Sequence, residues 1–90
     1  TDEEITKEIQ SRASEKIREF SRMMKSSTPA IFAAHLAAAE ATYSGSERSA
    51  IIGRDPVFST KVLAQKEFDY VALGHIHKFQ DLNLNNHPPV

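Results

Sequence analysis

The chain has 90 residues, a formal net charge of −1 and no cysteine. This length suits one domain and is too short for two. The charge gives no basic field of the kind that marks a self-sufficient nucleic-acid binder, and the lack of cysteine excludes disulfides and thiolate metal sites. No apolar run approaches the roughly 18 residues that a membrane span needs, and the acidic start is unlike a signal peptide. We therefore expect a cytoplasmic protein.

Residues 1–26 are predicted to form one amphipathic helix. Apolar side chains recur every three or four positions, at Ile5, Ile9, Ala13, Ile17, Phe20 and Met24. Thr1 and Glu4 form a candidate capping box. The helix should end in Ser26–Thr28, because Pro29 disfavours helical geometry in the residue before it. We expect the apolar stripe to cover a sheet, and a homodimer interface is the alternative.

Two short apolar runs are predicted to be parallel strands. Residues 30–34 and 69–73 are nearly continuous in apolar side chains, which is typical of strands buried in a parallel sheet. The connection between them is long enough for the crossover that parallel strands require. It has room for a helix at Thr60–Lys66 with Ser59 as N-cap, after an extended piece and turn at residues 50–56. This order indicates the α/β class, with a largely parallel sheet and covering helices.

The last ten residues contain turn signals and then an extended stretch. Asn85-Asn86 is typical of a turn, and Pro88-Pro89-Val90 looks like the opening of another strand. We expect the chain to be one part of a larger domain.

Both predicted strands end in histidine. His35 follows the first run, and Gly74, His75 and His77 follow the second. Ligands of open α/β sheets gather where strands end, and imidazole is a common metal ligand. We expect Gly74 to let the chain turn off its strand, and His35, His75 and His77 to converge on a metal site. His87, in the turn region, is expected to be solvated.

No general base is evident near these histidines. Asp69 stands at the far end of its strand, roughly 20 Å of extended chain from His75. Nothing in the sequence positions Glu40 or Asp81.

Residues 72–77, Ala-Leu-Gly-His-Ile-His, closely resemble the last metal motif of calcineurin-like metallophosphoesterases. Together with Phe68-Asp69-Tyr70-Val71 before them and Lys78-Phe79-Gln80 after them, they are most similar to the SbcD-type DNA exonucleases. Residues 31–35 and the segment Tyr43–Arg48 look like the preceding motif of the same nucleases. The similarity covers residues 29–90, whereas the helix at residues 1–26 matches only in type and position.

The resemblance implies part of a metallophosphoesterase sandwich and, in the complete protein, a metal-dependent exonuclease that hydrolyses DNA in DNA repair. It implies two divalent cations, typically Mn²⁺, one held by His35 and His75 and the other by His77. It also implies an SbcC-type coiled-coil ATPase as partner. The family's Asp-X-His and Gly-Asp motifs do not occur here, and Asn86-His87 comes too late to serve as its Asn-His motif. We therefore expect no catalytic residue in this chain, which alone should be inactive and bind manganese weakly.

Two other functions stay open on the sequence. One is a metallophosphoesterase that acts on small phosphate esters or nucleotides. The other is a non-catalytic packing or oligomerisation module that uses the apolar stripe of residues 5–24.

Overall fold

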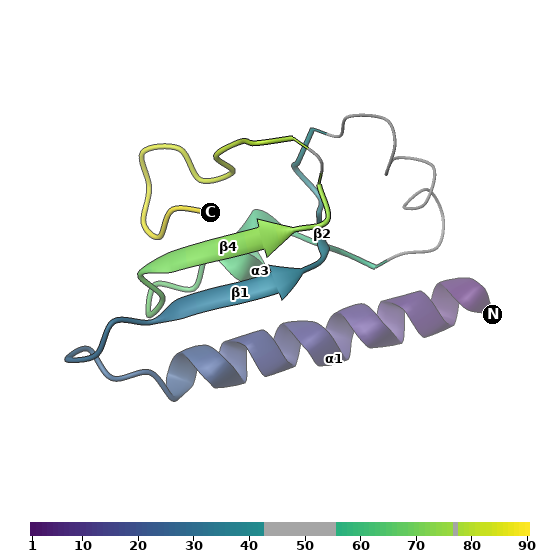
Figure 1. Ribbon diagram of the computed structural model, residues 1–90. Helices are drawn as coiled ribbons and strands as arrows, with labels where there is room; N and C mark the ends of the chain where they lie inside the picture. Colours follow the sequence, from purple (N-terminus) through teal and green to yellow (C-terminus); the bar gives the residue numbers. More distant parts are fainter. Residues whose placement is uncertain (43–55, 77) are drawn as a thin grey trace.

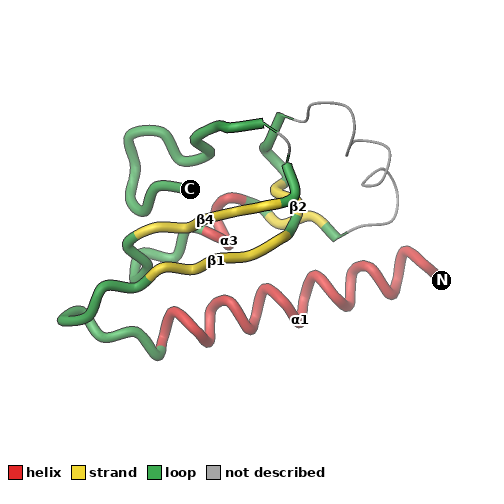
Figure 2. The backbone as a smooth tube through the Cα atoms, in the orientation of Figure 1, coloured by secondary structure: helices red, strands yellow, loops and turns green. Residues whose placement is uncertain are grey.

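The central feature of the computed structural model is a pair of parallel strands flanked by a long helix (Figures 1 and 2). The structure describes residues 1–42, 56–76 and 78–90. The helix is α1 (Asp2–Arg22), and the strands are β1 (Ile31–His35) and β4 (Tyr70–Gly74). They pair in parallel, from Ile31 opposite Tyr70 to His35 opposite Gly74. The predicted α/β class and parallel pairing are confirmed, with each strand displaced by one residue from its predicted bounds.

The crossover between β1 and β4 contains a second, shorter pairing that the sequence did not indicate. Strand β2 (Ala37–Ala38) pairs in parallel with β3 (Val57–Phe58). Helix α3 (Thr60–Leu63) follows, and Ser59 caps it by accepting a hydrogen bond from the Val62 N–H. The predicted cap is confirmed, but the helix is one turn long. The extended piece and turn predicted at residues 50–56 lie, except for Pro56, outside the described residues.

Helix α1 begins as predicted and ends earlier than predicted. The Thr1 hydroxyl accepts from the Glu4 N–H, and the Glu4 carboxylate lies 3.6 Å from the terminal amine. At the other end, the Met23 N–H turns back to the Phe20 carbonyl. The predicted end in residues 26–28 is wrong, because Pro29 sets only the last position at which a helix can stop.

The apolar stripe of α1 is only partly covered. Ile17 is buried, but Ile5 and Ile9 remain 59% and 47% exposed. A strand of five residues spans about 17 Å, whereas a helix of 21 residues is about 31 Å long. In Figure 1 the N-terminal half of α1 extends beyond the carboxyl ends of both strands. The prediction that the whole stripe covers a sheet is therefore wrong for that half.

One face of the β1–β4 pair is also open. Phe32 and Val71 lie on the face that packs into the core, where the Phe32 ring stacks on Phe68 with centroids 5.3 Å apart. On the other face, Ile31 is 69% exposed and its partner Tyr70 is 46% exposed. The runs were predicted to be buried strands, and the structure buries only one side of them.

The C-terminal segment returns to the sheet. The Asn86 N–H donates to the Asn83 carbonyl, and Asn85 has a φ of 63°, which confirms the predicted turn. The Pro89 carbonyl then accepts from the Val71 N–H. Residues 89–90 thus lie against β4 without forming a strand. No helix among the described residues has the length and apolar character of a membrane span.

Candidate metal centre

Two of the predicted site histidines meet where the parallel strands end. His35 is the last residue of β1, and His75 directly follows the last residue of β4. His75 Nδ1 lies 3.2 Å from His35 Nε2. The rings meet edge to face, with centroids 5.0 Å apart and planes at 81°. The parallel register therefore brings together side chains that are 40 residues apart in the chain.

The backbone turn that aims His75 occurs at His75 itself. Its φ is 81°, in a region that residues with a Cβ rarely adopt. Gly74 completes β4 without such a φ, so the expectation that Gly74 makes the turn is wrong. Its lack of a side chain serves another need, because a Cβ at Gly74 would lie 3.1 Å from His35 Nδ1. Gly74 leaves the space that the imidazole of His35 occupies.

A pocket of about 320 Å³ opens beside the two rings. Apart from His35 and His75, its lining is apolar and comes from Leu36, Ala37, Pro56 and Phe58. His75 Nε2 is buried and has no hydrogen-bond partner among the residues that the structure describes. A buried polar atom without a partner is rare in folded proteins and is often satisfied by a water or an ion.

The spacing of the two ring nitrogens fits a shared cation. Two nitrogen ligands at the metal–nitrogen distances of 2.0–2.1 Å that are typical of zinc lie about 2.8 to 3.4 Å apart for right-angled or tetrahedral coordination. The observed separation of 3.2 Å falls within that range. The same separation suits a hydrogen bond in which one ring donates, so the two rings also form a stable pair by themselves.

The carboxylates near these rings in the sequence have structural contacts. Asp69 Oδ2 accepts from the Ala30 N–H at 2.7 Å and fixes the start of β1. Glu40 Oε1 accepts from both the N–H and the hydroxyl of Thr60, at the start of α3. These hydrogen bonds, above all the one from the Thr60 N–H, hold the pKa of Glu40 below its ordinary value. The described residues contain no group of three or more His, Cys, Asp or Glu arranged to hold a metal.

The remaining sequence predictions are resolved in part. His87 is exposed, as expected, and its Nε2 lies 3.2 Å from the Lys66 carbonyl. His77 and the segment Tyr43–Arg48 lie outside the described residues. Asp81 accepts from the Asn83 N–H and stabilises a turn. Sequence reasoning missed the apolar wall of the pocket, because the β2–β3 pairing brings Phe58 there from a distant part of the chain.

Comparisons with known proteins leave the family of this chain open. No family model matches the sequence, and neither the curated proteins nor the solved structures contain a significant match.

Proposed function

We propose that this chain is part of a calcineurin-like metallophosphoesterase domain, from a metal-dependent DNA exonuclease of the SbcD type. The observation that carries the proposal is the contact between His35 and His75, at 3.2 Å, across the ends of two parallel strands. The resemblance of residues 29–90 to the nuclease motifs supports it independently of the geometry. Ligand sites at the carboxyl ends of strands are the rule in open α/β sheets.

The residues present fit a cation as two ligands of a larger set. His35 Nε2 and His75 Nδ1 have the spacing of neighbouring ligands, and Gly74 leaves room for the first of them. Divalent cations in such a site polarise a phosphodiester and lower the pKa of a bound water. His77 would serve a second cation. Two imidazoles offer few ligands for Mn²⁺, so we propose that the 90-residue chain alone is inactive and binds the ion weakly.

Binding can be tested on this chain by proton NMR. Mn²⁺ is paramagnetic and broadens signals close to it, so substoichiometric Mn²⁺ should broaden the ring signals of His35 and His75. The exposed His87 serves as the internal control. His35→Ala should remove the selective broadening of His75, and His87→Ala should not. Equal broadening of the His35, His75 and His87 signals would contradict the metal site.

Activity is tested in the complete protein that contains this sequence. We expect hydrolysis of linear duplex DNA with Mn²⁺, and a loss of at least about 100-fold for His75→Ala because removing a ligand disrupts the metal site. His87→Ala should retain the activity. Hydrolysis of small phosphate monoesters or nucleotides, with no DNA cleavage, would favour the other phosphoesterase function. A coiled-coil ATPase partner of the SbcC type and a cytoplasmic location belong to the same proposal.

A packing or oligomerisation module is the second candidate function. The exposed Ile5 and Ile9 on α1 and the exposed Ile31 on the sheet favour it. Such apolar surfaces on a folded protein commonly mark contact sites. This candidate predicts self-association without any dependence on a metal.

A further inference from the structure

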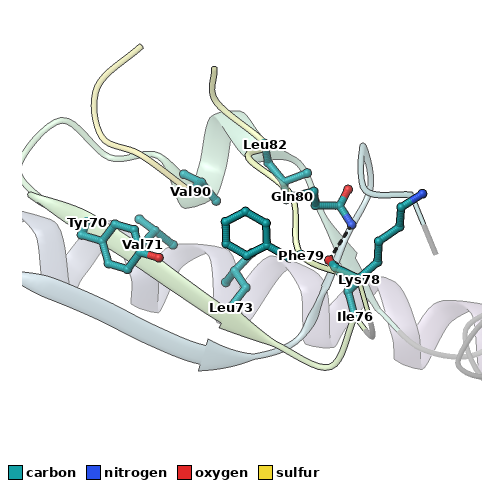
Figure 3. A pocket seen from close by; sticks show the side chains of 9 residues that line it. All are labelled: Tyr70, Val71, Leu73, Ile76, Lys78, Phe79, Gln80, Leu82 and Val90. Carbon is teal, nitrogen blue, oxygen red and sulfur yellow. Dashed lines mark hydrogen bonds between the residues drawn. The ribbon is translucent and has the colours of Figure 1, made fainter. Parts of the chain in front are cut away.

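Phe79 is the most exposed of the large apolar residues that the structure describes. Its side chain is fully exposed, at 102% of the reference value, on the loop that follows β4. Tyr70, at the start of β4, is 46% exposed. Both residues line the same shallow pocket of about 160 Å³. In Figure 3 Tyr70 stands at one end of this pocket and Phe79 near its middle.

The charge around Phe79 favours an anionic ligand. Lys78 lines the pocket at the end opposite Tyr70, with its ammonium group turned outward (Figure 3). No Asp or Glu side chain lines this pocket in the described part of the chain. The surface therefore combines exposed aromatic rings, an apolar floor and one cation. A planar aromatic group that carries a negative charge matches all three, and a nucleotide has that chemistry.

Residues that line the pocket are close to the candidate metal centre along the chain. Ile76, which lines the pocket, follows His75 in the chain, and Leu73 precedes Gly74. Phe79 is four residues from His75, and four residues of extended chain span at most about 14 Å. A nucleic acid strand with one phosphate at the histidines would thus have bases within reach of Phe79.

We propose that Phe79 stacks on an unpaired base of the DNA substrate while Lys78 pairs with its backbone phosphate. This inference rests on the proposed function and adds the strandedness of the substrate. The faces of bases inside a duplex are covered by their neighbours, so an exposed aromatic ring can stack only on a single strand or a frayed end.

The experiment measures binding of a fluorescently labelled oligothymidine to this chain at low salt with EDTA, so that metal plays no part. Phe79→Ala should weaken binding about 5- to 150-fold, the range found for loss of one stacked base. The chain has no Trp, so Phe79→Trp provides a single indole, whose fluorescence should be quenched by the oligonucleotide. Lys78→Gln should weaken binding and reduce its dependence on salt.

Leu84→Ala is the matched control, because Leu84 is 67% exposed and does not line the pocket. It should bind like the unmodified chain. The proposal is overturned if Phe79→Ala also binds like the unmodified chain, or if that chain shows no saturable binding at about 1 mM. If Phe79→Ala changed the oligomeric state and left oligonucleotide binding unaltered, the surface would be a contact between copies of this chain, and the proposal would likewise be overturned. Selective Mn²⁺ broadening of His35 and His75 is independent of this result, so each proposal can fail alone.

Discussion

At the residue scale, Gly74 and His35 face each other across the strands that form the candidate site. The space between them is narrow, since a Cβ at Gly74 would lie 3.1 Å from His35 Nδ1. The glycine was noticed in the sequence for the wrong reason, as a turn residue. Its role in leaving space depends on the register of two strands and could not be derived from the order of residues.

Gly74→Ala should push the His35 ring away from His75. We expect the cross-relaxation signal between the ring protons of the two histidines to be lost in NMR spectra. The free energy of unfolding should fall by no more than about 1 kcal/mol, because the glycine has ordinary strand geometry and the displaced ring is exposed. Leu84→Ala is the control, and an unchanged signal between the rings in Gly74→Ala would contradict this account of the contact.

Glu40 provides a prediction about pH. The hydrogen bond from the Thr60 N–H lowers the pKa of Glu40 in the folded state. The stability that this group contributes is therefore fully present above the pKa of the unfolded chain, about 4.3, and is lost as the pH falls through the lower pKa of the folded state. In Glu40→Gln, urea unfolding should show a shallower loss of stability between about pH 5 and pH 3. An equally steep loss would contradict the role of Glu40 at α3.

At the scale of elements, the helix caps and the strand pairing were predicted from the sequence better than the burial of side chains was. Ser59 and Thr1 cap their helices as expected, since a side-chain oxygen can satisfy a backbone N–H three residues on without help from the rest of the fold. Parallel pairing of β1 with β4 also followed from the long crossover. The second pairing, β2 with β3, involves two residues on each strand and has no periodic pattern that would reveal it.

The prediction that the whole apolar stripe of α1 is buried was wrong. The periodicity of a helix identifies its apolar face but not the length of the sheet against which that face packs. Ile17 is 4% exposed, whereas Ile9 on the same face is 47% exposed. Ile17→Ala should therefore lower the free energy of unfolding by about 2 to 5 kcal/mol. Ile9→Ala should change it by less than about 1 kcal/mol. Chemical denaturation of both variants makes the comparison, and similar losses would mean that the helix is covered along its whole length.

The candidate site was predictable in part. The sequence placed His35 and His75 at strand ends, and the parallel pairing brought them together as expected. Their apolar surroundings were not predicted, since Phe58 joins the pocket through the second sheet. Phe79 carried no signal either, because exposure of a single loop residue is decided by the packing around it.

At the scale of the whole molecule, the chain is more open than a compact domain of its size. Its accessible surface is 6245 Å², against about 5,200 Å² for a typical monomer of this mass. Its radius of gyration is 13.5 Å, against about 12 Å for a compact chain of 90 residues. Both differences agree with the open face of the sheet and the uncovered half of α1.

This openness predicts self-association. The apparent mass in sedimentation experiments should rise with protein concentration, because exposed apolar surface favours contact between copies. Ile9→Lys should reduce the association, since it places a charge in the exposed stripe without altering the buried Ile17. Phe79→Ala is the control for a surface elsewhere on the molecule. A monomer at every concentration would argue against the packing function and leave the metal centre untouched.

The register of β1 and β4 also couples binding of an ion to folding. His35 and His75 are brought within 3.2 Å only when both strands are in place, so neither strand alone can present the pair. An ion bound by both rings would bind only the folded state, because the two histidines are far apart in the unfolded chain. Such an ion would therefore shift the folding equilibrium towards the folded chain. The midpoint temperature of thermal unfolding of this chain should then rise with the concentration of that ion, whether or not the chain has catalytic activity.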